Sequence, residues 1–140
     1  LLFLADRAQH LHELVRPALA EGRIVISDRY QDSSLAYQSI GRGVGELIPT
    51  VFRHIGGLTP DLTILIDLEV EVAVARLRGR GASNRLDDEA PTFHGKVREA
   101  FLGLARSEPG RFEVFDGAVE VATLAAGILA RVQSRFGGLV

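Results

Sequence analysis

The order of the apolar segments constrains the fold of this chain more than any other feature. Three short runs rich in β-branched and aromatic residues, at residues 24–27, 62–67 and 112–115, are typical of buried strands. Each run is separated from the next by segments with helical periodicity. Strands that alternate with helices form a parallel sheet with helices on both faces. The sequence therefore predicts a three-layer α/β fold.

The helical segments share apolar residues at three- and four-residue spacing and end near glycine or polar residues. They are predicted at 2–20, 34–40, 46–55, 70–80, 92–107 and 118–136. Ser33 is expected to cap the second of them. Residues 81–91 are polar, contain Gly and Pro and lack periodicity, which is typical of a mobile loop. We expect a single domain over residues 1–140, because no repeat or linker divides the chain.

Composition excludes several classes of function. The net charge is −2, so no basic surface for nucleic acid is indicated. There is no cysteine, which excludes disulfides and thiolate chemistry. The apolar opening at residues 1–5 is too short to cross a membrane and is followed at once by charged residues. We therefore expect neither a nucleic acid nor a membrane as partner.

Residues that follow strands are the first candidates for a site, because ligands of open α/β sheets bind beyond the carboxyl ends of the strands. Asp28 and Arg29 follow the first predicted strand. The aspartate suits a magnesium-bound water, and the arginine suits a phosphate. An ordinary ion pair at the strand end is the alternative for this dipeptide taken alone.

The run Asp28-Arg29-Tyr30-Gln31-Asp32-Ser33-Ser34-Leu35-Ala36-Tyr37-Gln38 resembles the pattern of the thymidylate kinase family. Upstream, residues 3–8 resemble the family helix that lines the nucleoside pocket. Downstream, Arg85 and residues 93–98 resemble its lid and the helix that follows the lid. The resemblance extends from Leu1 to about Val132 and implies a P-loop nucleoside monophosphate kinase-like parallel sheet with flanking helices.

The resemblance implies roles on the acceptor side of the site. Phe3 would stack on thymine, and Arg7 would contact the base or phosphate of the acceptor. Arg29 would grip the acceptor phosphate, with Asp28 beside it to place the metal. The remaining acceptor contacts are polar groups at the base edge and aromatic groups at the sugar, namely Ser34, Gln38, Tyr37 and Phe101. Phe101 departs from the family, which usually has tyrosine there. Without these flanking matches, Phe3 and Tyr37 would be read as core residues.

The resemblance also implies roles on the donor side. Arg85 would close over ATP from the lid, although Asn84 stands where the family often has aspartate. Asp116, Gly117 and Ala118 resemble the loop beside adenine, where backbone groups bind, although Asp-Gly after a strand is also a common turn. Basic residues on the neighbouring helices are weaker candidates, and helix-dipole stabilisation explains the first two equally well: Arg76, Arg80 and Arg98.

The family's phosphate loop, GxxxxGK[ST], does not occur in these 140 residues. The chain also contains no methionine and opens within a helical pattern without a cap. We therefore expect a fragment whose sheet is incomplete at the N-terminus. We expect the preceding region to supply a strand and the phosphate loop, and the fragment alone to be inactive.

The activity implied by the resemblance is transfer of the γ-phosphate of ATP to thymidylate (dTMP), giving dTDP, with Mg²⁺. The resemblance also implies a cytoplasmic homodimer, for which the helices at 2–20 and 46–55 are candidate contact surfaces. Two alternatives remain open: a deoxynucleoside kinase, which shares an acidic residue and an arginine after a strand, and a non-catalytic module that keeps only the nucleotide pocket or the dimer surface.

Overall fold

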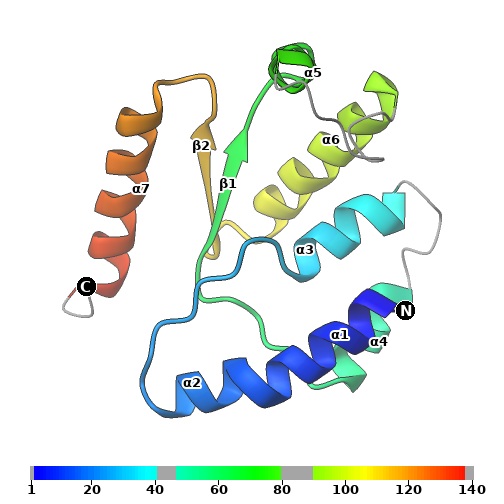
Figure 1. Ribbon diagram of the computed structural model, residues 1–140, viewed down its shortest axis with the longest axis vertical. Helices are drawn as coiled ribbons and strands as arrows, with labels where there is room; N and C mark the ends of the chain where they lie inside the picture. The colour runs from blue at the N-terminus through cyan, green and yellow to red at the C-terminus, as the bar shows by residue number, and fades with distance from the viewer. Residues whose placement is uncertain (1, 41–46, 80–89, 138–140) are drawn as a thin grey trace. The chain divides into compact units, whose positions relative to one another are not determined.

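The structure is a computed structural model that describes residues 2–40, 47–79 and 90–137, with side chains up to residue 37 in the first range. The chain divides into two compact units, Leu1–Pro60 and Asp61–Val140. Figure 1 shows that the first unit is helical and that the strands belong to the second.

A long helix opens the first unit, as predicted over 2–20. It consists of α1 (Leu2–His10), a π-helical segment η1 (Leu11–Val15) and α2 (Arg16–Ala20). Its buried face carries apolar residues at helical spacing: Leu4, Leu11, Val15 and Ala18. Gly22 ends it with a φ of +74°, and the amide of Arg23 donates to the carbonyl of Ala18. This is the left-handed helix end that glycine favours.

The strand predicted at residues 24–27 is wrong for this structure. The segment lies outside regular secondary structure, and the Ile26 side chain is 92% exposed. A strand is held by hydrogen bonds to a neighbour, and no strand occurs among the described residues of the first unit. The β-branched composition indicates a surface that fits a sheet, which is a preference that depends on context.

Two helices follow in the first unit. The first begins at Gln31, three residues before the predicted start, as α3 (Gln31–Ser34), and continues as a π-helical segment η2 (Leu35–Ile40). Tyr30 is its N-cap residue, without a side-chain capping bond, so the prediction that Ser33 caps this helix is wrong. The next helix is α4 (Leu47–His54), close to the predicted 46–55.

The end of α4 is built closely against its neighbours. Gly56 has a φ of +68°, and its carbonyl accepts a hydrogen bond from Arg16 in α2. A Cβ atom on Gly57 would overlap the ring of Phe52. Phe52 is buried and meets the ring of Tyr30 edge to face, with the ring centroids 5.6 Å apart. Glycine at position 57 therefore leaves room for the aromatic pair.

The second unit contains a parallel pair of strands, β1 (Thr63–Asp67) and β2 (Phe112–Asp116), in register from Thr63↔Phe112 to Asp67↔Asp116. Between them run α5 (Val70–Gly79) and α6 (Pro91–Ser107), and α7 (Val121–Phe136) follows β2. These elements confirm the two later predicted strands and the three later helices.

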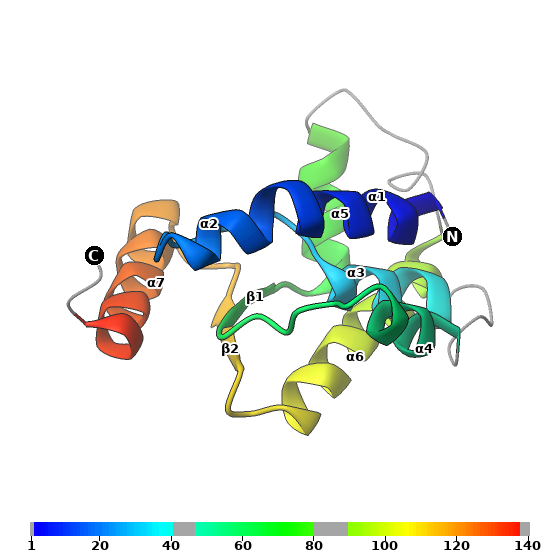
Figure 2. The ribbon, with the colours of Figure 1, turned by 90° about the horizontal axis from the view of Figure 1, so that it is seen from below.

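Side chains alternate between the two faces of this strand pair. Asp67 faces α6, because it is bonded to Arg98 of that helix. The opposite face meets α7, where Glu113 pairs with Arg131 and Phe115 lies against Gly127. Figures 1 and 2 accordingly show α6 and α7 on opposite sides of the strands. The helix–sheet–helix layering confirms the α/β prediction.

Candidate functional site

Arg7 joins two segments of the first unit that are distant in the sequence. Its Nη1 donates to the Ser34 hydroxyl at 3.0 Å, and its Nη2 donates to the Tyr30 carbonyl at 3.1 Å. Its guanidinium carbon also lies 5.1 Å from the centroid of the Tyr30 ring. Thus α1 and α3 present one polar cluster, which contains two of the predicted acceptor residues.

Burial shapes the electrostatics of this cluster. Burial lowers the pKa of the Arg7 guanidinium, and the nearby Tyr30, Asp6 and Asp32 oppose the shift. Burial likewise raises the pKa of the Tyr30 phenol, and the positive charges of Arg7 and Arg16 oppose the shift. Arg7 is therefore a half-buried cation, a placement that strengthens its hydrogen bonds to a ligand relative to those of a solvated arginine.

Arg29 lies two residues before α3 in an uncommon backbone conformation. Its φ is +64°, and it is the one non-glycine residue among those described with a positive φ. The Ser27 hydroxyl donates to its carbonyl at 2.9 Å, and its guanidinium lies 5.3 Å from the centroid of the Tyr37 ring. Residues held in such conformations concentrate at functional sites. The turn brings together two further residues of the predicted acceptor site.

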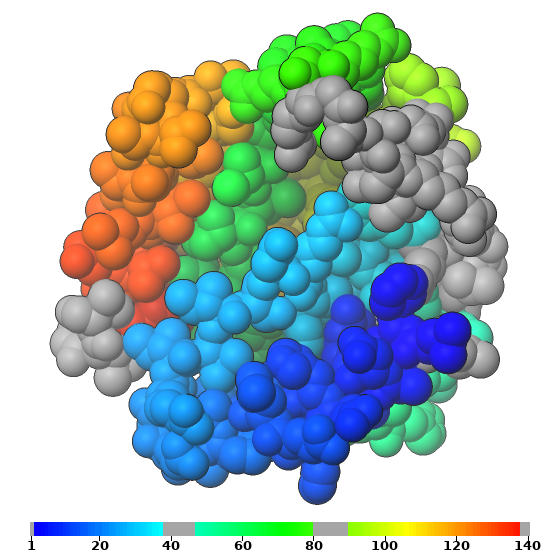
Figure 3. Space-filling view, viewed as in Figure 1, coloured from blue at the N-terminus to red at the C-terminus, as the bar shows by residue number. Residues whose placement is uncertain are grey.

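The structure describes the exposure of two other predicted acceptor residues of the first unit, and of a third it describes only the backbone. Phe3 is 66% exposed on α1, one helical turn before Arg7, and Figure 3 shows this helix at the surface of the view. Asp28 is exposed. Gln38 lies in η2, and its side chain is outside the described residues. An exposed aromatic ring beside a half-buried arginine suits the stacking of a planar ligand.

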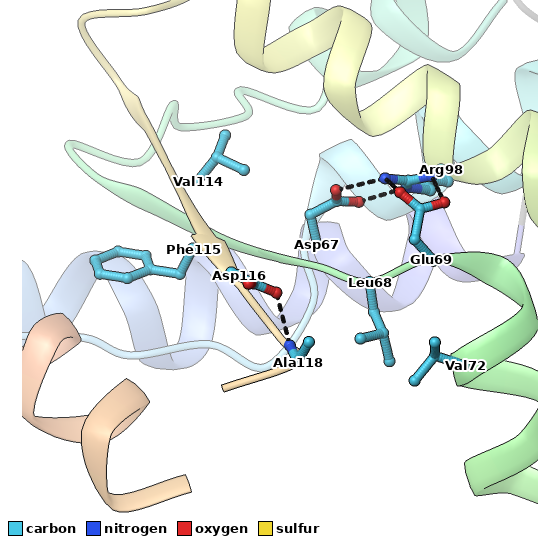
Figure 4. Close-up of a pocket in the computed structure, with 9 residues that line it drawn as sticks. All are labelled: Asp67, Leu68, Glu69, Val72, Arg98, Val114, Phe115, Asp116 and Ala118. Atoms are coloured by element: carbon cyan, nitrogen blue, oxygen red, sulfur yellow. Dashed lines mark hydrogen bonds and ion pairs between the residues drawn. The ribbon is translucent and has the colours of Figure 1, made fainter. Parts of the chain in front are cut away.

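In the second unit, charged residues meet where β1 ends. Arg98 of α6 donates two hydrogen bonds to the Asp67 carboxylate, at 2.7 and 2.8 Å, and two to the Glu69 carboxylate, both at 2.6 Å. Figure 4 shows the guanidinium between the two carboxylates. The donation from Arg98 lowers the pKa of Asp67. We call these three residues the Arg98 clamp, because they tie α6 to the end of β1.

Beside the Arg98 clamp, a hollow of about 430 Å³ opens at the carboxyl ends of β1 and β2. Its lining combines charged and apolar side chains, which Figure 4 labels: Asp67, Leu68, Glu69, Val72, Arg98, Val114, Phe115, Asp116 and Ala118. The position agrees with the rule that ligands of parallel sheets bind beyond this edge. Two of the three residues predicted beside adenine belong to the lining.

Gly117 lies between those two residues, and its backbone is engaged within the protein. Its amide donates to the carbonyl of Asp67, and its carbonyl accepts from Arg76 of α5 at 2.9 Å. The Ala118 amide donates to the Asp116 carboxylate at 2.7 Å. A Cβ on Gly117 would lie 2.9 Å from the Asp67 carbonyl oxygen, so only glycine fits this close approach.

The remaining predicted residues complete the picture. Phe101 lies half-buried in α6. Arg85, Asn84 and Arg80 fall outside the described residues, as does most of the predicted lid loop. Within the described ranges, no three His, Cys, Asp or Glu side chains gather into a metal-binding group. Nor does any helix there combine the length and apolarity needed to span a bilayer.

Comparison with known proteins decides the family. The sequence model described as thymidylate kinase matches residues 1–128. The chain belongs to the thymidylate kinase family. A thymidylate kinase of Trichlorobacter lovleyi is 43% identical over 96% of the chain and 68% of its own length. Those of Clavibacter michiganensis and Carboxydothermus hydrogenoformans are 47% and 53% identical, over 65% and 58% of their own lengths.

A solved structure confirms the fold. The crystal structure of thymidylate kinase from Ehrlichia chaffeensis superposes with a TM-score of 0.71 at 26% identity, covering 94% of this chain and 61% of that one. The predicted nucleoside monophosphate kinase-like fold is therefore confirmed. The chain spans about two thirds or less of the length of these relatives.

Sequence reasoning missed two parts of this arrangement. The sequence indicates no role for Tyr30, although it contacts Arg7 through both its ring and its carbonyl. Asp67 is also absent from the predicted site residues, although it ends a predicted strand just as Asp28 follows one. Extending the rule for residues after strands to the last residue of each strand finds Asp67. Its pairing with Arg98, 31 residues later, depends on how α6 packs on the sheet.

Proposed function

We propose that the protein containing this chain transfers the γ-phosphate of ATP to thymidylate, giving ADP and dTDP. The observation that carries the proposal is the cluster in the first unit, where Arg7 and Ser34 meet while Arg29 and Tyr37 pair on the next turn. Membership of the thymidylate kinase family supports the choice of substrate. In this reaction an oxygen of the acceptor phosphate attacks the γ-phosphorus as its bond to the leaving ADP oxygen breaks.

The acceptor would be held by base, sugar and phosphate contacts. Phe3 stacks on the thymine ring, while Arg7 contacts the base or the phosphate. A guanidinium has five N–H donors, and the bonds to Ser34 and Tyr30 use only one on each terminal nitrogen. Arg29 binds the acceptor phosphate. Ser34, Gln38, Tyr37 and Phe101 complete the pocket at the base edge and the sugar.

The donor side would be formed by Arg85 and the loop from Asp116 to Ala118. The amides of Gly117 and Ala118 donate within the protein. Adenine would therefore meet other groups of this loop, with the hollow beside the Arg98 clamp next to them. Arg85 would neutralise charge that develops on the transferred phosphate.

Magnesium and assembly belong to the same proposal. Mg²⁺ is usually bound by one or two carboxylates together with substrate phosphates and water. The carboxylate of Asp28 is exposed and so fits this kind of site. When bound, the ion neutralises phosphate charge. We further propose that the protein acts as a cytoplasmic homodimer.

The proposal is tested on the gene product that contains this chain. ADP release is measured with ATP and Mg²⁺ and with either thymidylate or thymidine as acceptor. We expect turnover with thymidylate and none with thymidine, because the Arg29 guanidinium recognises an acceptor phosphate. Turnover of thymidine alone would contradict the proposal and favour a deoxynucleoside kinase.

The role of Arg29 is tested with Arg29→Gly, which removes the guanidinium and accommodates the positive φ. We expect thymidylate turnover to fall by roughly a hundredfold or more, in line with the loss of a charged phosphate contact. Arg23→Ala is the matched control, since Arg23 is an exposed arginine of the same unit. Unchanged turnover in Arg29→Gly would show that Arg29 does not hold the acceptor phosphate.

A further inference from the structure

We infer that Tyr30 is a positioning residue of the acceptor site, and that its aromatic ring, rather than its hydroxyl, orients the guanidinium of Arg7. The inference rests on the proposed function insofar as Arg7 contacts the acceptor nucleotide. It adds a positioning residue to the site and connects the aromatic pair of Tyr30 and Phe52 to acceptor binding.

The first step is that Tyr30 restricts the orientation of the Arg7 guanidinium through two contacts. Its carbonyl accepts from Nη2 at 3.1 Å, and its ring lies 5.1 Å from the guanidinium carbon. The Ser34 hydroxyl accepts a hydrogen bond from Arg7 Nη1 at 3.0 Å. The carbonyl contact is available to any residue at position 30, whereas the ring contact requires an aromatic side chain. Of the two contacts, only the ring contact therefore depends on which amino acid occupies position 30.

The second step is that the ring itself is held. Phe52 of α4 meets it edge to face, at an interplanar angle of 84°. Phe52 is 5% exposed, and Gly57 leaves space for its ring. Edge-to-face pairing fixes the plane of the Tyr30 ring. The orientation of Arg7 is thus supported from α4, through two aromatic side chains.

The third step concerns what this support does for binding. An arginine side chain has several rotatable bonds, and ordering it when a ligand arrives weakens affinity. Holding Arg7 in place beforehand removes that loss. The effect belongs to the binding of the acceptor, so it should appear in the KM for thymidylate and leave kcat nearly unchanged.

The experiment uses the gene product that contains this chain, with Tyr30→Leu, Tyr30→Phe, Arg7→Gln and the double variant Tyr30→Leu/Arg7→Gln. We expect Tyr30→Leu to raise the KM for thymidylate roughly three- to thirtyfold, the range of a cation–π contact, with kcat and the KM for ATP within about twofold. Tyr30→Phe should have the wild-type KM for thymidylate, because it keeps the aromatic ring.

The double variant separates positioning through Arg7 from a general structural effect. If Tyr30 acts through Arg7, adding Tyr30→Leu to Arg7→Gln leaves the KM no higher than Arg7→Gln alone. Additive effects, or a Tyr30→Phe variant as impaired as Tyr30→Leu, would overturn the inference. Thermal unfolding of each variant confirms that it folds.

A ligand-free measurement keeps this test independent of the proposed activity. In the wild-type protein, NMR should show nuclear Overhauser contacts between the Arg7 side chain and the Tyr30 ring protons, with the Arg7 Nε–H signal shifted by the ring. Absence of both would overturn the inference, even if thymidylate is phosphorylated. Their presence in a protein that does not phosphorylate thymidylate would refute the proposed function and leave the positioning of Arg7 established.

Discussion

At the scale of single residues, Arg29 combines a role proposed in binding with a backbone conformation that side chains disfavour. Its φ of +64° places it in the left-handed region, which costs an L-residue about 1–2 kcal/mol relative to the right-handed one. The surrounding turn maintains this conformation, since the Ser27 hydroxyl donates to the Arg29 carbonyl. Residues kept in such conformations concentrate at functional sites, which agrees with the role proposed for the Arg29 guanidinium.

This strain predicts an order of stability between two variants of Arg29. Both Arg29→Gly and Arg29→Ala remove the guanidinium and its contact with Tyr37, but only glycine adopts a positive φ without cost. We expect Arg29→Gly to exceed Arg29→Ala by about 1 kcal/mol in the free energy of unfolding, measured by urea titration. Equal stability of the two variants would show that the turn relaxes when the arginine is removed.

Candidate residues could be named where a motif carried the information, but contacts between distant segments could not. The run from Asp28 to Gln38 supplied Arg29, Ser34 and Tyr37 as candidates, and in the structure Ser34 contacts Arg7 while Tyr37 contacts Arg29. The ring contact of Tyr30 and the pairing of Arg98 with Asp67 were not predicted. Such contacts depend on helix packing, which periodicity alone does not specify.

At the scale of elements, helices were predictable because their signal is local. Apolar spacing located α1 to α2, α4, α5, α6 and α7 within a few residues. The π-helical segments η1 and η2 were not predicted, since one extra residue in a turn leaves no clear mark on apolar spacing. The strand predicted at residues 24–27 fails for the opposite reason, because its signal is not local. A strand requires a hydrogen-bonded neighbouring strand, and the composition of one segment does not show whether that neighbour is present.

The helix α6 offers a test of element stability. Gly95 lies within it, and a Cβ there would have no heavy atom within 4 Å. We expect Gly95→Ala to raise the free energy of unfolding by about 0.5–1 kcal/mol, because alanine restricts the unfolded chain and favours the helix. Thermal unfolding followed by circular dichroism measures the change.

Gly57→Ala is the matched contrast for that variant. Its Cβ would overlap the ring of Phe52, so the same substitution should lower stability, by about 1–3 kcal/mol. If both variants shifted the unfolding transition in the same direction, the space around these two glycines would not be what controls the outcome.

At the scale of the whole molecule, the order of elements specified the fold class, while ion pairs secure how the elements of the second unit meet. Arg98 joins α6 to β1 through Asp67, and the buried Arg111 joins the end of α6 to the strands through Glu108 and Thr63. Such pairs are not visible in the alternation of strands and helices. They also depend on the parallel pairing of β1 with β2, which sets Thr63 beside Phe112 and Asp67 beside Asp116.

These pairs predict how stability depends on pH. The hydrogen bonds from Arg98 and Arg111 lower the pKa values of Asp67 and Glu108 below their ordinary values of 3.8 and 4.5. A carboxylate with a lowered pKa in the folded state contributes stability above its unfolded pKa. That contribution is lost as the pH falls through the folded pKa. We therefore expect the free energy of unfolding to decline as the pH falls below about 4.5.

Asp67→Asn isolates the part of this decline that belongs to the Arg98 clamp. At pH 7 the variant should melt roughly 3–5 °C below the wild type, because the ionic bonds to Arg98 are weakened. The difference should close as the pH falls below about 3.8, where protonation removes the same charge from the wild type.

Glu99→Gln is the control for Asp67→Asn. The Glu99 Oε2 atom lies 3.8 Å from Arg106 Nη2, in an exposed ion pair that contributes little to stability. The 16 Lys and Arg and the 4 His are the same in all three proteins, so the positive charge that these groups carry in acid affects all three alike. A gap between Asp67→Asn and the wild type that stays constant down to pH 2.5 would therefore show that packing, rather than the Asp67 charge, holds α6 to β1.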